Sequence, residues 1–292
     1  MTELETRVRA LSCWTDPTDI APLTGGITNL NATVVDGGRK YVVRLGRDIP
    51  EHGILRWNEI AVARAAAAAG VSPGVVHAEP GAVVFDFVDG EALTEEALHD
   101  PATLAMATDL VARVHRDVTP RLRGPVLTFW VFHVCRDYAA FLRENGSPHG
   151  PALDRLMAEA ARLEEAVGPV RPVLGHNDLL PANFIRDGQA MWLVDWEYGG
   201  FNSALFDLGG LASNAGLPPE AEDEMLARYL GHRPDRPFRH SYGAMRCASL
   251  LRETMWSMVS EITSELDFDY AAYTAGNLAR FDAALAAWKD MS

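Results

Sequence analysis

Three side chains in the middle of the sequence could together carry out phosphoryl transfer. Asp178 could accept the proton of an attacking hydroxyl group, while Asn183 and Asp195 offer hard oxygen ligands for Mg²⁺. Transfer of a nucleotide phosphoryl group needs one carboxylate near the nucleophile and further oxygen ligands that hold the metal against the phosphates. The sequence therefore predicts a phosphotransferase in which Asp178 is catalytic and Asn183 and Asp195 bind Mg²⁺.

Short strands should place these side chains on adjacent loops. Residues 173–174, 184–185 and 191–194 are short apolar runs, and Asp187-Gly188 between the last two is a turn signal. The three polar side chains lie just outside these runs. We therefore expect them at strand ends, where loops can bring them together.

The N-terminal part of the chain has the pattern of a small antiparallel sheet. Residues 32–35, 40–45 and 83–88 are strand-like, and Asp36-Gly37-Gly38 between the first two is typical of a hairpin turn. Residues 57–69 between the second and third strands are helical in pattern, with a glycine stop at position 70. The pattern predicts a sheet with one inserted helix.

The rest of the chain is mostly helical in pattern. Residues 102–167 are expected to be helical, and so are 242–266 and 270–288 near the C-terminus. The change from strand to helix falls near residues 89 and 90. We expect an α+β, bilobal fold, with a small antiparallel β N-lobe at 1–89 and a larger, mostly helical C-lobe at 90–292.

Composition narrows the classes of partner. The chain has 292 residues, and its 26 basic and 40 acidic residues give a net charge of −14, which argues against nucleic acid or an anionic membrane as partner. No signal peptide or membrane span is expected, because the longest apolar run is too short. The three cysteines lie far apart, which fits a reducing compartment. The sequence predicts a cytoplasmic protein and leaves its oligomeric state open.

The spacing of the central motif resembles a known superfamily. His176-x-Asp178-x-x-x-x-Asn183, followed by Asp195, is similar to the catalytic and metal loops of the kinase-like phosphotransferases, which include aminoglycoside phosphotransferases and choline and ethanolamine kinases. The chain differs from protein kinases, because Trp-Glu follows Asp195 in place of Phe-Gly and no Ala-Pro-Glu is present. The resemblance implies a bilobal protein-kinase-like fold, with ATP and Mg²⁺ as cofactors.

Further segments resemble the choline/ethanolamine kinase family more narrowly, in order, from about residue 20 to 285. They include a glycine-containing hairpin loop, the metal segment, an acidic segment behind it and two stretches of C-terminal helix. These segments are residues 22–31, 195–198, 206–209, 255–259 and 266–273. The resemblance implies a small amino alcohol as substrate, choline in the first place or ethanolamine.

The resemblance also implies which residues bind the nucleotide. They are Gly26, Thr28, Asn29, Arg44, Glu59, Phe87 and Val88. The first three belong to the loop that would cover the phosphates. The strand arginine would pair with the phosphates and be held by the helix glutamate. The last two would form the hinge that binds adenine through the backbone.

The implied substrate pocket resembles the family less closely than the catalytic and nucleotide-binding segments do. Its candidate residues are Tyr198, Glu253, Trp256 and Tyr273. Aromatic faces bind quaternary ammonium groups. Two positions depart from the eukaryotic family members: Asn214 stands where they carry a glutamate, and Glu253 where they carry an aromatic residue. A pocket with a carboxylate and fewer aromatics suits a primary amine as well as a trimethylammonium group.

Three neighbouring residues have supporting roles in this interpretation. His176 is expected to pack within the catalytic loop, and Asp207 to anchor that loop by accepting backbone N–H bonds. Glu197 could assist the metal through a water molecule.

Two other functions stay open. One is a kinase of the same fold acting on another hydroxyl compound, such as an aminoglycoside or thiamine. The other is a nucleotide-binding module without catalysis, which the intact set of Asp178, Asn183 and Asp195 disfavours.

Overall fold

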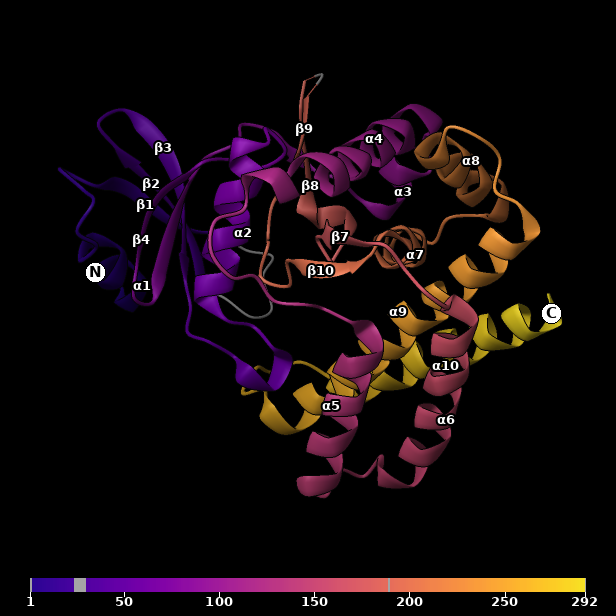
Figure 1. Cartoon of the computed structure of the whole chain (residues 1–292). Helices are drawn as coiled ribbons and strands as arrows, with labels where there is room; N and C mark the ends of the chain where they lie inside the picture. The colour runs from indigo at the N-terminus through magenta and orange to yellow at the C-terminus, as the bar shows by residue number, and fades with distance from the viewer. Residues whose placement is uncertain (1, 24–29, 189, 292) are drawn as a thin grey trace.

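A five-stranded antiparallel sheet forms most of the N-terminal lobe. The computed structural model describes residues 2–23, 30–188 and 190–291. The sheet lies on the left of Figure 1, and its strands run in the order β1-β2-β3-β5-β4. The elements of this lobe are α1 (Glu3–Arg9), β1 (Thr18–Leu23), β2 (Leu30–Asp36), β3 (Arg39–Leu45), α2 (Arg56–Ala68), β4 (Val75–Glu79) and β5 (Ala82–Asp86). A 3₁₀ turn, η1 (Pro50–His52), precedes α2.

The predicted hairpin sets the register of this sheet. β2 and β3 pair from Leu30↔Leu45 to Asp36↔Arg39, around two glycines with positive φ at positions 37 and 38. β3 is the central strand, since β5 pairs with its other edge. Arg44 therefore lies in the middle of the sheet and is only 9% exposed.

Helix α2 joins the two lobes through a shared apolar core. Its buried face includes Val62 and Ala66, and it ends just before Gly70, which has a φ of 70°. Both residues belong to a cluster of buried side chains that also contains Leu193 and Trp196 of the C-lobe. Because α2 packs on both lobes, the side chains on it are fixed relative to the loops beyond β9.

Helices and two small sheets form the C-lobe (Figure 1). Its helices are α3 (Glu95–Leu98), α4 (Pro101–Asp117), α5 (Val131–Glu144), α6 (Gly150–Val167), α7 (Ala204–Asn214), α8 (Pro219–Leu230), α9 (Arg236–Thr263) and α10 (Tyr270–Asp290), with 3₁₀ turns η2 (Thr119–Arg121) and η3 (Pro181–Asn183). Its strands are β6 (Glu91–Ala92), β7 (Pro172–Gly175), β8 (Phe184–Asp187), β9 (Ala190–Leu193) and β10 (Gly200–Ser203). β7 pairs with β10, and the other three form a sheet in the order β6-β8-β9.

The predicted α+β bilobal fold is confirmed, with several local differences. The sequence pattern missed helices α1, α3 and α7, the edge strands β1 and β4 of the N-lobe, and the short strands β6 and β10. The continuous helical region expected at 102–167 is wrong, because the chain leaves the helix between α4 and α5. Pro120 and Gly124-Pro125 lie in that gap, and prolines cannot continue a helix. The division into 1–89 and 90–292 stays a prediction.

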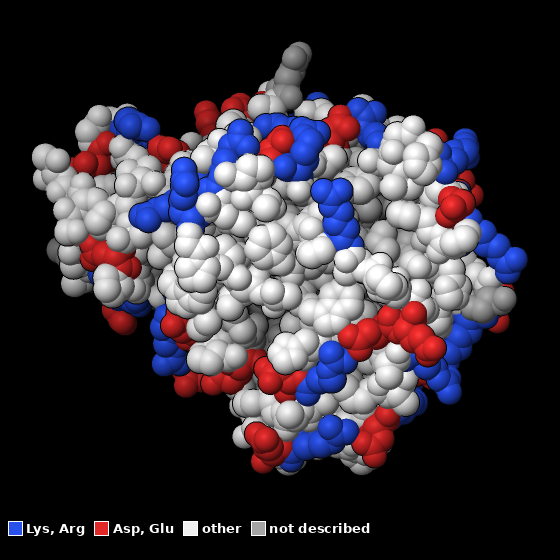
Figure 2. All heavy atoms as spheres, viewed as in Figure 1, with Lys and Arg blue, Asp and Glu red and all other residues white. Residues whose placement is uncertain are grey.

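The surface of the described chain is mixed in charge. On the face shown in Figure 2, the middle is largely uncharged, and acidic and basic side chains lie mainly around the margin. Among the described residues, none of the helices combines the length and the apolar character needed to cross a membrane.

The crossing of α7 and α9 brings two site-bearing helices close together. Gly209 of α7 lies directly against the backbone of α9: a Cβ at this position would come within 2.9 Å of Arg246 Cα. The same two helices carry site residues, since Asp207 belongs to α7 and Arg252 to α9. The glycine is therefore required by close approach of two backbones.

We expect Gly209→Ala to lower the free energy of unfolding by about 1–3 kcal/mol, because the added methyl group must push two buried helices apart. Gly276→Ala in α10 is the matched control, since a Cβ added at this position would meet no described atom within 4 Å. That change should be neutral or raise stability by about 0.5–1 kcal/mol. Urea unfolding of the two variants checks the expectation, and equal effects would contradict it.

Candidate functional site

The loop after β7 is held from behind by one buried carboxylate. Asp207 accepts the backbone N–H of His176 at Oδ2 and that of Asn177 at Oδ1, both at 2.8 Å. It also accepts a bond from His115 Nε2 at 2.9 Å. The predicted anchoring role of Asp207 is therefore confirmed, and His115 is a partner that the sequence did not reveal.

Hydrogen bonding keeps Asp207 ionised despite its burial. Burial raises the pKa of Asp207, but the hydrogen bond and charge of His115 outweigh it, so the pKa lies below its ordinary value. A buried carboxylate with several N–H donors is a stable anchor. The loop that begins at His176 thus has a fixed backbone.

Two further contacts shape this loop. Asn177 has a φ of 66°, and its Nδ2 donates to Tyr198 O at 2.9 Å and Gly200 O at 3.1 Å. His176 donates from Nε2 to Val194 O at 2.8 Å, and burial lowers its pKa, so the ring is neutral. His176 therefore joins the loop to the segment after β9, which agrees with the packing role expected for it.

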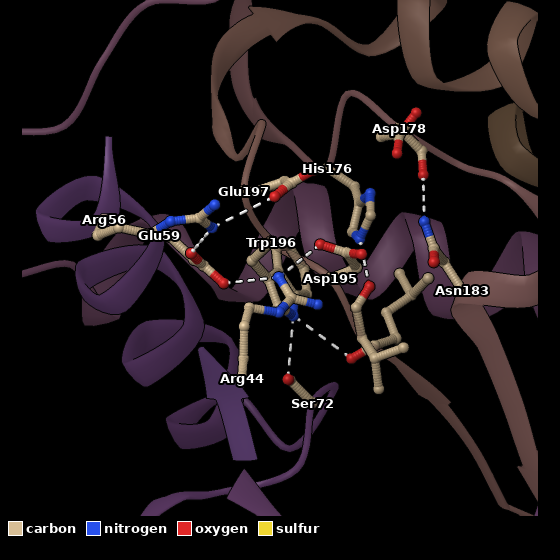
Figure 3. Close-up of polar contacts among 12 residues, drawn as sticks. Arg44, Arg56, Glu59, Ser72, His176, Asp178, Asn183, Asp195, Trp196 and Glu197 are labelled. Carbon is tan, nitrogen blue, oxygen red and sulfur yellow. Dashed lines mark hydrogen bonds and ion pairs between the residues drawn. The ribbon is translucent and has the colours of Figure 1, made fainter. Parts of the chain in front are cut away.

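Asp178 and Asn183 lie side by side at the opening of this loop. Asn183 Nδ2 donates to the backbone oxygen of Asp178 at 2.9 Å, as Figure 3 shows. This bond fixes the amide plane, so the side-chain oxygen of Asn183 is the atom left to accept or to bind a metal. Asn183 belongs to η3 and is 8% exposed.

The carboxyl group of Asp178 sits in an unusual electrostatic environment. Burial raises its pKa to about 8; the charge of Arg252 opposes this shift, and nearby carboxylates, Glu253 first, support it. A carboxyl with such a pKa exchanges its proton near neutral pH. Asp178 can therefore act as a proton acceptor under physiological conditions.

Asp195 is paired with the strand arginine across the two lobes. Arg44 Nη1 lies 2.7 Å from Asp195 Oδ1 and 2.7 Å from Glu59 Oε1 (Figure 3). Burial raises the pKa of Asp195, and the charge of Arg44 outweighs burial, so the pKa is lowered. Asp195 has a φ of 68°, which is uncommon for a residue with a side chain. It is therefore an ionised carboxylate held in a strained turn.

A second arginine extends this network. Arg56 Nη1 lies 2.6 Å from Glu59 Oε2 and 3.3 Å from Glu197 Oε2. Glu59 is fully buried behind Arg44, and Figure 3 shows both arginines converging on it. The acid of α2 thus orients the guanidinium of β3, as the resemblance implies.

A hollow of about 480 Å³ separates the lobes beside this network. Its wall is mostly apolar, with polar groups gathered at one end. The lining includes the predicted nucleotide and metal residues Arg44, Phe87, Val88, Asn183 and Asp195. Gly26, Thr28 and Asn29 lie outside the described residues. Pockets of this size and character accept small molecules and cofactors.

A much smaller cavity lies beside Asp178. Its volume is about 10 Å³, and its lining includes Asp178, Asn214, Ser249, Arg252 and Glu253. Such a volume holds about one water molecule. A larger molecule could enter only if neighbouring side chains moved.

The four predicted pocket residues form two hydrogen-bonded pairs near this cavity. Trp256 Nε1 donates to Tyr198 Oη at 3.0 Å, and Tyr273 Oη donates to Glu253 Oε1 at 2.8 Å. Only Glu253 lines the small cavity itself. The rings of Tyr198 and Trp256 are buried, and Tyr273 is half-buried.

Arg252 is a further site residue that sequence reasoning missed. Its Nη1 lies 3.0 Å from Glu253 Oε2 and 4.0 Å from Asp178 Oδ1, and its guanidinium carbon lies 4.3 Å from the ring centroid of Tyr198. The signal was an arginine directly after Leu250-Leu251 in a strongly apolar stretch of α9. A charge on a buried helix face points to a buried partner.

Comparisons with known proteins show which proteins the chain is similar to. A family model described as "Phosphotransferase enzyme family" matches residues 19–242. Protein LicA of Haemophilus influenzae is 27% identical over 273 residues, which cover 89% of this chain and 77% of that protein. A probable ethanolamine kinase of Arabidopsis thaliana is 25% identical and is matched over 86% of this chain and 75% of its own length.

A solved structure shows the same architecture. A choline/ethanolamine kinase family protein from Mesorhizobium loti superposes with a TM-score of 0.79 at 28% identity. The alignment covers 96% of this chain and 94% of that one. The two-lobed arrangement is therefore shared along nearly the whole chain.

We expect Asp178→Asn to raise the stability of the chain at neutral pH. The folded-state pKa of about 8 exceeds the value of about 4 for an aspartate in an unfolded chain, so ionised Asp178 destabilises the fold above pH 4, increasingly up to pH 8. The amide removes that penalty, which is on the order of a few kcal/mol. Thermal unfolding at pH 7.5 should give a higher Tm for the variant, and the gain should shrink toward pH 4.

Asp267→Asn, at an exposed position, serves as the control and should show no such trend. A lower Tm for Asp178→Asn than for the unmodified chain at pH 7.5 would contradict the raised pKa.

Proposed function

The chain belongs to the phosphotransferase enzyme family, and we propose that it is an ATP- and Mg²⁺-dependent kinase of a small amino alcohol of the choline and ethanolamine class. One observation carries the proposal: Asn183 and Asp195 line a nucleotide-sized hollow, and Asp178, whose backbone oxygen accepts from Asn183, lines a small cavity that also contains Glu253. The relatives named as an ethanolamine kinase and as a choline/ethanolamine kinase family protein support the substrate class.

The hollow between the lobes fits a nucleotide. Its apolar wall suits a purine ring, and Phe87 and Val88 stand where the hinge is proposed. The Phe87 N–H already donates to Lys40 O at 3.3 Å, and the Val88 oxygen accepts from the Gly90 N–H at 3.0 Å, so the Phe87 oxygen and the Val88 N–H are the hinge groups that would serve the base. At the polar end, Nε of Arg44 is buried and has no hydrogen-bond partner within the described chain. A phosphate oxygen would satisfy this donor.

Asn183 and Asp195 would hold the metal. Both offer oxygen atoms, which Mg²⁺ prefers, and the metal usually keeps water and substrate phosphates as its other ligands. Two protein ligands are therefore enough for a metal that the nucleotide also binds. Bound there, Mg²⁺ would neutralise charge on the phosphates during transfer. Glu197, held by Arg56, would contribute only through water.

Asp178 would accept the proton of the substrate hydroxyl. A general base works best when its pKa lies near the working pH, and the buried carboxyl of Asp178 meets that condition. Its backbone is fixed by the loop contacts to Asp207, so the carboxyl group has a defined position. The adjacent Glu253 would attract the ammonium group of the substrate and so direct its hydroxyl toward Asp178.

The cavity beside Asp178 argues for a small acceptor. At about 10 Å³ it is far from the size of a multi-ring aminoglycoside, which would require extensive rearrangement of α7 and α9. An amino alcohol requires the smallest expansion among the acceptors considered.

We expect Asp178→Asn to reduce turnover by about 10²–10⁴ while the affinity for nucleotide stays within a few-fold. The amide cannot accept the hydroxyl proton, but it leaves the nucleotide hollow unchanged. A coupled assay of Mg²⁺-dependent ADP release, run with choline, ethanolamine, thiamine and an aminoglycoside, tests both this and the substrate class. Turnover near that of the unmodified enzyme, in a folded variant, would refute the role of Asp178.

We expect Asn183→Ala and Asp195→Asn to raise the Mg²⁺ concentration needed for half-maximal rate, because each change removes or weakens an oxygen ligand. Asp187→Ala, at an exposed position in β8, is the control and should leave the Mg²⁺ requirement unchanged. The measurement is a Mg²⁺ titration at saturating ATP. Identical titration curves for both variants and the unmodified enzyme would place the metal elsewhere.

A further inference from the structure

The acceptor pocket already contains a cation of its own. Arg252 is buried, with its side chain only 4% exposed, and pairs with Glu253 at 3.0 Å. Its guanidinium lies over the face of Tyr198, 4.3 Å from the ring centroid, and 5.7 Å from that of Phe129. This is the position at which an aromatic face would bind a substrate cation.

A second aromatic face proposed for the pocket is also covered, and the third candidate, Tyr273, does not line the cavity. The ring of Trp256 packs against His52 at a centroid distance of 5.2 Å and against Tyr270 at 6.2 Å. Its indole N–H donates a hydrogen bond to the hydroxyl group of Tyr198. Trp256 therefore supports Tyr198 from behind, and neither ring presents an open face to the cavity.

The carboxylates remain as the groups that a substrate cation can reach. Asp178 and Glu253 both line the small cavity, and their side chains are 17% and 21% exposed. When both are ionised, these two carboxylates and Arg252 carry one net negative charge, which one ammonium group would balance. The third carboxylate of the lining, Asp207, is already occupied by His115 and two backbone N–H groups. Carboxylate oxygens bind a cation best when it donates hydrogen bonds. A primary ammonium has three such donors, and a trimethylammonium group has none.

The small volume of the cavity also favours a primary ammonium group over a trimethylammonium group. The cavity of about 10 Å³ must expand for any acceptor, and three methyl groups on nitrogen require the largest expansion. Arg252 limits that expansion, because its stacking on Tyr198 and its pairing with Glu253 hold it in place. Repulsion from the guanidinium also favours an ammonium group that stays on the carboxylate side of the cavity.

We propose that Arg252 determines acceptor specificity by covering the face of Tyr198, so that the pocket selects a primary ammonium alcohol over its trimethylammonium counterpart. The inference rests on the proposed function and names the substrate class within it. Arg252 would not touch the reacting hydroxyl group. It would act by occupying the aromatic face and by leaving Asp178 and Glu253, among the described residues that line the cavity, to accept hydrogen bonds from the substrate nitrogen.

A methylation series tests the inference in the unmodified enzyme. The acceptors are ethanolamine, N-methylethanolamine, N,N-dimethylethanolamine and choline, and the measurement is kcat/KM for each at saturating ATP and Mg²⁺. We expect kcat/KM to fall as methyl groups are added, most steeply at choline, where the last N–H is lost. The total fall should be about tenfold or more. Equal or higher kcat/KM for choline would overturn the inference and leave the proposed function intact.

Two variants then assign the selection to Arg252. Arg252→Met uncovers Tyr198, and we expect it to raise the choline-to-ethanolamine ratio of kcat/KM by about tenfold. Losing the positive charge also changes Asp178 and the overall attraction of cations, but those effects act on both substrates and cancel in the ratio. Arg252→Lys keeps a cation beside Tyr198 and should keep the ratio within about threefold of the unmodified enzyme.

The outcomes distinguish a failure of the role of Arg252 from a failure of the proposed function. A folded Arg252→Met variant with an unchanged ratio would overturn the role of Arg252. If Arg252→Met does not fold, the series in the unmodified enzyme together with Arg252→Lys decides. No phosphorylation of any of the four alcohols would overturn the proposed function itself.

Discussion

The structure depends on holding several carboxylates close together in buried positions. Repulsion between buried negative charges would open the cleft, and two buried guanidinium groups offset most of them. Arg44 joins Glu59 of α2 to Asp195 of the C-lobe at 2.7 Å on each side, and Arg252 lies between Glu253 and the more distant Asp178. The partners come from separate elements, so the same contacts that balance charge also set the position of the lobes. Where charge remains unbalanced, the pocket attracts a cation.

Two packed helices behind the cleft, α7 and α9, hold these charged groups in place. Asp207 fixes the backbone of the loop that carries Asp178, and it stands on α7. Gly209 lets α7 lie directly on α9, the helix that carries Arg252. One pair of crossed helices therefore determines the distance between the proposed base and the groups that would hold the substrate nitrogen. A small shift of α7 against α9 would displace residues on both sides of the pocket, because close-packed interiors transmit strain.

Local signals in the sequence allowed prediction of the parts that depend on short segments. Asp178 and Asn183 lie on one short loop, and the turn at residues 36–38 forms the expected hairpin. The edge strands β1 and β4 lacked such signals, because β1 is largely exposed, β4 is mostly half-buried, and neither strand shows clear alternation. The role of Arg252 could not be predicted either, since it arises from contacts between α9 and the segment around Tyr198, which are distant in sequence. The sequence shows which side chains are present, but tertiary packing decides which aromatic faces remain accessible to a substrate.

The most direct test of the central claim is ³¹P NMR of a reaction containing the unmodified enzyme, ATP, Mg²⁺ and ethanolamine. The account predicts a new phosphomonoester resonance that grows as ADP forms and matches O-phosphorylated ethanolamine, with no comparable growth of inorganic phosphate. This result would show that the cleft delivers the phosphoryl group to the alcohol and excludes water. ADP and inorganic phosphate without the phosphomonoester, or no consumption of ATP with any amino alcohol, would contradict the account.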